Sequence, residues 1–119
     1  MRVEAELAGS WQNDLKTLKA VRRELNRMWS APVTYTADAT MTREHFAIIL
    51  DGTSNSVDYT LLTPSDVEGM VVWIKCKDAT SAVRAIGTID WASNHSFATN
   101  ESVILKSESN SWLIYGGYP

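Results

Sequence analysis

The C-terminal segment, residues 101–119, constrains the fold of this chain more than any other part of the sequence. Two runs of β-branched and aromatic residues, 103–105 and 112–115, flank the polar segment Ser107–Ser111. Strand-forming runs on either side of a short polar segment are typical of a β-hairpin. The sequence therefore predicts that the chain closes with a hairpin at the end of a strand-rich C-terminal part.

The first 30 residues carry a different pattern, in which apolar residues recur at helical spacing. These residues are Trp11, Leu15, Leu18, Leu25 and Met28, with Trp29 beside them. The opposite side of the same segment carries the basic residues Lys16, Lys19, Arg22, Arg23 and Arg27. Ser10 can cap the start, and Pro32 ends the helix after roughly five turns. The pattern predicts an amphipathic helix whose apolar face packs against a sheet.

Between these two ends, the sequence predicts a second helix and several strands. Thr42 and Glu44 precede the apolar run 46–50, and Gly52 follows it, which is typical of a capped helix over 42–51. Short connections after Asn55 favour antiparallel neighbours in the sheet. The predicted strands lie at 33–36 and near 57–63, 69–77, 82–92, 97–107 and 111–118.

The composition is that of an ordinary globular domain. The 119 residues are 45% hydrophobic and 21% charged, so we expect one domain that spans residues 1–119. With a net charge of −3, we expect no strong electrostatic attraction to nucleic acid or to a membrane. The N-terminus shows no apolar signal-peptide core, so a cytoplasmic location is expected. Cys76, the one cysteine, is expected to be a small apolar strand residue.

Two of the predicted strands are apolar on both faces. In the segment 82–92, Val83 and Ile89 lie on one face and Ile86 lies on the other, and residues 71–74 have the same character. Such strands are typical of sheets that are covered on both sides. We expect helices to cover one face and a second subunit to cover the other, so the sequence predicts a homodimer that forms through the sheet.

Two local sequences resemble a known family. The segment Tyr35-Thr36-Ala37-Asp38-Ala39-Thr40, followed by the predicted helix, resembles the Tyr-Ala-Asp-Asp-Ala-Thr segment of ketosteroid isomerase-like proteins. The segment 107–115, with a polar turn before Trp112, resembles their final hairpin. In its order of elements, the chain resembles the nuclear transport factor 2-like superfamily, which is also called SnoaL-like or cystatin-like.

The resemblance implies an α+β fold in which N-terminal helices pack on a strongly curved antiparallel sheet that forms a conical cavity. It also implies dimerisation through the sheet and, often, a ligand pocket. Arg43 stands closest to the place where isomerase-like members have their catalytic aspartate, and an arginine cannot act as that base. The isomerase chemistry is therefore not carried over, because one fold hosts many functions.

An acid–base pair in such a cavity requires two titratable groups in different environments. Asp90 stands in the apolar segment 82–92, and Arg84, six residues earlier, shares its strand face. We therefore consider Asp90 as the acid–base group and Arg84 as its orienting cation, with Tyr35 as a third catalytic candidate. The alternative interpretation is an exposed or purely structural ion pair.

Three aromatic residues, Trp29, Trp73 and Tyr115, are expected to line a pocket for a small apolar molecule. Two distant histidines give no metal-ligand spacing, and no glycine loop indicates a cofactor. The first functional hypothesis is thus a small-molecule-binding protein, with lyase, isomerase or hydrolase activity left open. The alternative is a non-catalytic homodimeric interaction module whose cavity is filled by its own side chains.

Overall fold

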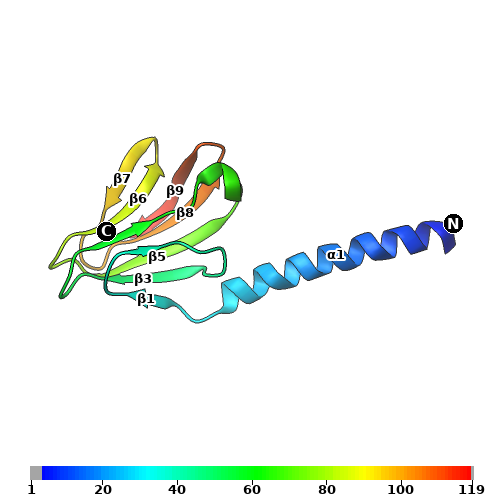
Figure 1. Cartoon of the computed structure of the whole chain (residues 1–119), viewed down its shortest axis with the longest axis horizontal. Coiled ribbons are helices and arrows are strands. Elements are labelled where there is room, and N and C mark those ends of the chain that lie inside the picture. The colour runs from blue at the N-terminus through cyan, green and yellow to red at the C-terminus, as the bar shows by residue number, and fades with distance from the viewer. Residues whose placement is uncertain (1–3, 119) are drawn as a thin grey trace.

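The computed structural model describes residues 4–118, with side chains from residue 16 to residue 117. It contains one long helix and a β domain (Figure 1). Helix α1, Glu4–Trp29, has 26 residues and projects away from the β domain, so we call it the stem. The β domain comprises the strands between residues 33 and 118. The molecule is accordingly elongated, with extents of 63 × 29 × 22 Å.

The β domain is a single mixed sheet that is nearly closed into a barrel. Its strand order is β1-β3-β5-β8-β9-β6-β4-β2, and β7 pairs with β6 outside this order. One short 3-10 helix, η1, precedes β5. The elements are β1 Val33–Tyr35, β2 Ala39–Thr40, β3 Ala47–Asp51, β4 Val57–Thr60, η1 Pro64–Val67, β5 Val71–Asp78, β6 Val83–Ile89, β7 Ala92–Ser96, β8 Ser102–Glu108 and β9 Ser111–Tyr118.

Consecutive strands from β1 to β6 alternate between the two halves of this sheet. β1, β3 and β5 pair in parallel in one half, and β2, β4 and β6 pair in parallel in the other. The antiparallel β8–β9 hairpin extends the first half from β5. The two halves meet where Ile89 of β6 pairs with Trp112 of β9. The chain therefore winds around the core instead of folding back after each strand.

Two matching corners support this winding. At the ends of β3 and β5, Asp51 and Asp78 accept hydrogen bonds from the backbone amide and the hydroxyl of Thr53 and Thr80, at 2.5–3.0 Å. The backbone N–H of Gly52 donates to the carbonyl oxygen of Asp78 at 2.7 Å, so the corners lie side by side. A Cβ at Gly52 would lie 2.6 Å from a neighbouring backbone oxygen, which is why glycine is required there.

The interior between the two halves is filled by side chains of the β domain. Trp112 is fully buried, and its indole N–H donates to the carbonyl oxygen of Leu62 at 2.8 Å. Alternate residues of β3, β5 and β8 point inward, as the two-residue period of a strand requires. The largest buried side chains are Trp112, Tyr59, Ile48, Leu50, Ile74 and Leu105. These side chains occupy the space that the predicted conical cavity would have taken.

The predicted helix over 42–51 is wrong, because residues 47–51 form strand β3. Ile48 and Leu50 are buried while their neighbours are partly exposed, which is the alternation of a strand. The amide of Glu44 does approach the Thr42 hydroxyl, at 3.4 Å, as expected of a cap. The run is too short for a stable helix, and parallel pairing with β1 and β5 on its two sides makes it a strand.

The predicted antiparallel cone is also wrong, and with it the resemblance to the nuclear transport factor 2-like, SnoaL-like or cystatin-like fold. That fold has several N-terminal helices on a curved antiparallel sheet, whereas this chain has one helix and a mixed, mostly parallel sheet in its described part. The short connections after β4 and β5 lead to the opposite half of the sheet, not to an antiparallel neighbour. The α+β composition and the closing hairpin, β8–β9, are confirmed.

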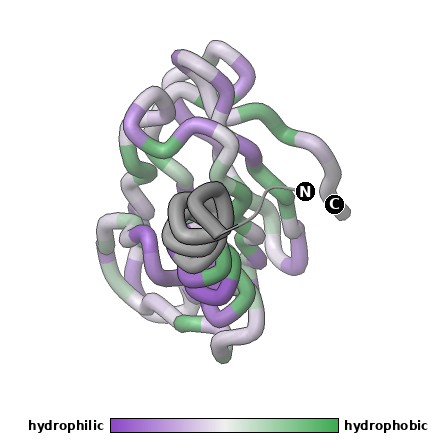
Figure 2. Tube along the Cα trace, turned by 90° about the vertical axis from the view of Figure 1, so that its right-hand side faces the viewer, coloured by the Kyte–Doolittle hydropathy of each residue, from purple (hydrophilic) through white to green (hydrophobic). Residues whose placement is uncertain are grey.

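The N-terminal helix and its end were predicted correctly, but its start and its packing were not, because α1 begins at Glu4 and Ser10 lies inside it. It ends at Trp29, just before Pro32, as the sequence indicated. Instead of lying on the sheet, it extends beyond one end of the β domain (Figure 1). Figure 2 looks along the stem and shows hydrophobic and hydrophilic residues alternating along its backbone, and the large apolar side chains of its described part are 47–85% exposed. The apolar face of the described stem is therefore not covered by the β domain.

Candidate functional site

The predicted catalytic arginine, Arg84, forms an ion pair with Asp58. Its guanidinium donates to both carboxylate oxygens of Asp58, from β6 to β4, at 2.9 and 2.8 Å. The backbone N–H of Asp58 donates in turn to the carboxylate of Asp38 at 2.9 Å. The hydrogen bonds that Arg84 donates to the Asp58 carboxylate raise the pKa of Arg84 above its ordinary value. A shallow hollow of about 500 Å³ lies beside this pair.

Asp90, the predicted acid–base group, lies beyond the end of β6. It forms the two-residue turn to β7 together with Trp91, and both have left-handed backbone angles, φ of 47° and 64°. A carboxylate oxygen of Asp90 accepts a hydrogen bond from the backbone N–H of Ile114 at 3.1 Å. Arg84 pairs with Asp58 instead, so the expected pair does not form. A catalytic role for either residue stays a prediction.

Tyr35, the third catalytic candidate, packs on the edge of the core. It lies on β1, and its ring centroid is 5.5 Å from that of Tyr59 on β4. Burial raises the pKa of the Tyr59 hydroxyl, so this second ring is not poised for proton transfer. In the described structure, no hydrogen bond or ion pair joins Tyr35, Arg84 and Asp90. The structure does not assemble these three residues into one site.

The three aromatic residues predicted to line a pocket face solvent. Trp29 at the base of the stem is 85% exposed, and Trp73 of β5 is 47% exposed. Tyr115 of β9 is also exposed, donates its hydroxyl to Glu108 and lies under the Lys106 ammonium at 5.7 Å. These three residues therefore do not line a pocket in the interior of the described structure. The small-molecule hypothesis stays a prediction.

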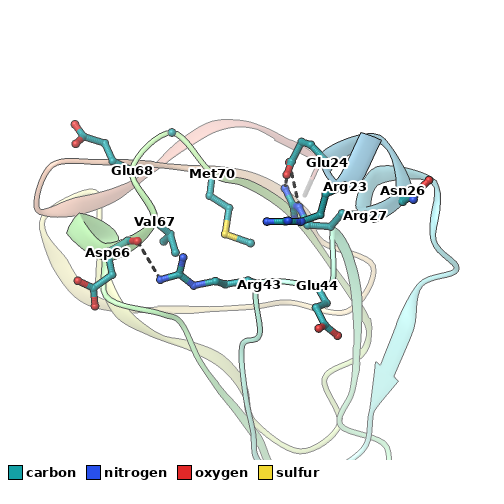
Figure 3. Close-up of a pocket in the computed structure, with 11 residues that line it drawn as sticks. Arg23, Glu24, Asn26, Arg27, Arg43, Glu44, Asp66, Val67, Glu68 and Met70 are labelled. Carbon is teal, nitrogen blue, oxygen red and sulfur yellow. Dashed lines mark hydrogen bonds and ion pairs between the residues drawn. The ribbon is translucent and has the colours of Figure 1, made fainter. Parts of the chain in front are cut away.

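A hollow of about 1090 Å³ lies where the stem meets the β domain (Figure 3). Its charged side chains have both signs, and two of its arginines hydrogen-bond to other residues that line it. The Arg27 guanidinium donates to the Glu24 carboxylate at 2.7 Å, and Arg43 donates to the carbonyl oxygen of Asp66 at 3.2 Å. Such a polar, open junction does not fit the small apolar ligand that the sequence suggested.

Two other potentially reactive side chains, Cys76 and His95, are packed or paired with neighbouring residues of the β domain. Cys76 is buried in β5, and burial raises the pKa of its thiol, which makes it a poor nucleophile. His95 lies 2.7 Å from the Glu101 carboxylate and packs edge-on against Phe97. Within residues 4–118, no three His, Cys, Asp or Glu side chains are grouped to hold a metal ion.

Arg27 fixes the base of the stem to the β domain. Its side chain is buried, and its guanidinium donates to the carbonyl oxygens of His45 at 2.8 Å and Val71 at 2.7 Å. The guanidinium also lies over the Phe46 ring, 5.3 Å from its centroid. These contacts lie just before β3 and at the start of β5. The position of the last turn of the stem is therefore defined by hydrogen bonds and a cation–π contact.

The largest uncovered apolar feature of the described chain is a stripe along the stem. It consists of Leu18, Val21, Leu25 and Met28, with Trp29 at its base, and each side chain is 47–85% exposed. An α-helix turns by about 100° per residue, so Leu18 and Leu25 lie about 160–180° around the helix from Arg27. Attachment through Arg27 therefore leaves this stripe, which we call the stem stripe, open to a partner.

The spacing within the stem stripe is that of a coiled coil. The first four members are separated by three, four and three residues, which are the a and d positions of two heptads. The apolar residues from which the helix was predicted did not include Val21, so the pattern indicated an amphipathic helix that packs on a sheet. The alternation of three and four was the signal that could have identified the stripe.

Comparison with models of known protein families and with curated proteins finds no match for this chain. In residues 4–118, no helix combines the length and apolar character needed to cross a membrane. The candidate site therefore rests on the geometry of the stem itself.

Proposed function

We propose that this chain is a non-catalytic, self-associating interaction module, in which α1 forms a coiled coil with the same helix of other copies. The exposed stem stripe is the observation that carries this proposal. Leu18, Val21, Leu25 and Met28 follow the a/d pattern, and the β domain leaves them uncovered. The β domain would then be the part that the assembly displays.

The energetics of the stem favour association over isolation. An isolated helix is marginal in water, because most helical stability in proteins comes from packing an apolar face. Fully burying one leucine contributes about 1.5–3 kcal/mol. The 26 residues of α1 are long enough for more than three heptads, at about seven residues each. A helix whose apolar stripe is exposed in one copy gains this burial in a coiled coil.

The residue types in the stripe favour more than two copies. Leu18 and Leu25 take the a position, and the β-branched Val21 takes a d position. Leucine at a with isoleucine at d shifts parallel coiled coils toward trimers and tetramers, and Val21 supplies a β-branched residue at one of the two d positions, the other being Met28. We therefore expect three or four copies per assembly.

Light scattering on the purified full chain, separated by size, tests the proposal. We expect a mass of three or four times the 13.2 kDa of one chain, and a mass of one chain for Leu25→Lys. Asn26→Lys is the matched control, because it adds the same charge to an exposed neighbouring position outside the stripe. A one-chain mass for the unaltered protein, or an unchanged mass for Leu25→Lys, would contradict the proposal.

A further inference from the structure

The stem stripe is flanked by two exposed side chains that can hydrogen-bond to each other. When Leu25 takes the a position of its heptad, Glu24 takes the preceding g position and Trp29 takes the following e position. The g and e positions border the a/d stripe on opposite sides. Trp29 is 85% exposed, more than any other large apolar side chain of the described chain, and the Glu24 side chain is 57% exposed. A helix that covers the stem stripe would therefore also contact both flanks.

The Glu24 carboxylate is held in place by Arg27 through only one of its oxygens (Figure 3). The guanidinium donates from Nε at 3.1 Å and from Nη2 at 2.7 Å, and both hydrogen bonds reach Oε1. Within the described residues, Oε2 has no hydrogen-bond donor. Arg27 also donates to the carbonyl oxygens of His45 and Val71, so Glu24 is fixed to the β domain through it. A side chain that is ordered in advance loses less entropy when a partner binds.

Trp29 supplies the kind of donor that Glu24 can accept. An indole N–H only donates hydrogen bonds and an ionised carboxylate only accepts them, and a bond to an ionised group is stronger than a neutral one. Among the residues that the structure describes, the Trp29 indole has no acceptor, whereas the buried Trp112 indole donates to Leu62. Trp29 and Glu24 cannot meet within one helix, because five residues turn an α-helix by about 500° and leave them about 140° apart. A direct bond between these two side chains therefore joins two copies.

We propose that the coiled coil is parallel and that Trp29 of each copy packs beside Glu24 of the next copy, donating its indole N–H to that carboxylate. This inference rests on the proposed self-association of the stem. In a parallel coiled coil, a g position faces the e position that lies five residues further along the neighbouring helix. Glu24 and Trp29 have this spacing. In an antiparallel coiled coil, g positions face g positions and e positions face e positions, so this pair cannot form.

An assembly of three or four parallel helices would satisfy every member of this pair. Each helix presents its g side to one neighbour and its e side to the other, so a closed ring joins each Glu24 to one Trp29. The pair lies in the last two turns of the stem, and Arg27 connects it to the β domain. It would therefore set the register of the helices at their junction with the β domains and hold these domains at one end of the assembly.

Paired cysteines test this geometry in the full chain. In the double variant Glu24→Cys and Trp29→Cys, the two thiols lie on opposite sides of the stripe and are too far apart to join within one helix. We expect mild oxidation to link three or four copies covalently, as resolved by denaturing electrophoresis without reductant. Either single variant should remain unlinked, and so should Arg23→Cys with Trp29→Cys, because Arg23 takes the f position on the far side of the helix. All these chains retain the buried Cys76.

The contribution of the hydrogen bond is measured by Trp29→Phe, which keeps an aromatic ring and removes the indole N–H. Sedimentation at decreasing concentration of the full chain gives the dissociation constant of each assembly. We expect Trp29→Phe and Glu24→Ala each to weaken association by about tenfold, and the double variant by no more than the stronger of the two. Trp91→Phe is the matched control, at a tryptophan that is 77% exposed and lies outside the stem. It should associate like the unaltered chain.

Other outcomes separate this inference from the proposed function. If Leu25→Lys gives single chains but the paired cysteines stay unlinked, the parallel contact is overturned and the coiled coil stands. Linkage through Glu24→Cys alone would overturn the parallel arrangement, and an unchanged dissociation constant in Trp29→Phe would overturn the hydrogen bond. If Leu25→Lys leaves the assembly intact, or the unaltered chain sediments as single copies, both proposals are overturned.

Discussion

The β domain buries a core of large apolar side chains, whereas the stem exposes its own to solvent. The β domain encloses Trp112, Tyr59 and Leu50 completely, whereas the stem exposes Leu18 and Leu25 to about half of their surface or more. Both regions have a regular apolar pattern, with a period of two residues in the strands and of three and four in the helix. The β domain therefore buries its apolar pattern within one chain, whereas the stem leaves its pattern uncovered, which is the basis of the proposed self-association.

Arg27 connects these two regions through a small number of polar contacts. Its guanidinium reaches the carbonyl oxygens of His45 and Val71, and the apolar core of the β domain does not continue into the stem. Changes in one region should therefore leave much of the other intact. Three predictions test this separation, beginning with the largest expected effect.

Truncation of the central core residue should unfold the β domain. We expect Trp112→Ala to reduce the free energy of unfolding by about 3–5 kcal/mol, because it leaves a large cavity and removes the hydrogen bond to Leu62. Thermal unfolding followed by circular dichroism provides the measurement. Trp91→Ala, at a residue that is 77% exposed, should change the stability by about 0.5 kcal/mol or less. Equal effects of the two substitutions would show that Trp112 does not occupy the core.

Substitution of Arg27, which connects the two regions, should destabilise the β domain less than Trp112→Ala does. It should change the position of the stem more. Arg27→Met leaves the carbonyl oxygens of His45 and Val71 without their donor, which costs about 1–3 kcal/mol. We expect a lower melting temperature of the β domain and faster amide exchange at the end of the stem. Arg23→Met removes an exposed arginine of the same helix and is the control. An unchanged melting temperature in Arg27→Met would argue against a fixed junction.

Acid should weaken the β domain through its two corners. Hydrogen bonds from the Thr53 side chain and amide lower the pKa of Asp51 below its ordinary value of 3.8, and Thr80 does the same for Asp78. A carboxylate with a lowered folded-state pKa stabilises the fold above its unfolded pKa, and this contribution is lost as the pH falls through the folded pKa. Melting temperatures should therefore fall below about pH 4.

A single substitution isolates this effect at one corner. Thr53→Val removes the hydroxyl that donates to Asp51 and should reduce the acid-dependent part of the destabilisation. Thr34→Val, at an exposed position of β1, serves as the control. If Thr53→Val and the unaltered chain lose the same stability between about pH 5 and about pH 3, Asp51 does not contribute through this hydrogen bond.

Local patterns in the sequence were sufficient for part of the fold. The hairpin over 101–119 was predicted because its two strands are adjacent in sequence and its turn is polar, and the structure confirms it as β8–β9. The N-terminal helix was predicted from spacing alone. In 82–92, one of the two proposed faces, which carries Val83 and Ile89, is buried. Each of these features depends on interactions between residues that are close in sequence.

The features that were missed depend on distant partners. The run 46–50 is short enough to be a helix or a strand, and its pairing with β1 and β5 decides between them. Short connections suggested antiparallel neighbours, but the corners at Asp51 and Asp78 carry the chain to the other half of the sheet. The repeated Asp-x-Thr sequence at these corners was the available signal for a winding chain.

The candidate site was missed for a related reason. The catalytic candidates were chosen for a conical cavity, and the structure fills the corresponding space with side chains such as Trp112. Arg84 was expected beside Asp90, but parallel pairing of β4 with β6 places Asp58 next to it. The stem stripe needed no distant partner for its recognition, and Val21 alone would have completed its heptad pattern.

The central claim is that the stem needs other copies to remain helical and the β domain does not. Circular dichroism of the full chain over a wide dilution range tests it most directly, with tryptophan fluorescence of the same samples as the record of the β domain. We predict that the helical signal falls on dilution while the fluorescence of buried Trp112 stays constant. A helical signal that does not change with dilution down to single chains would contradict the claim.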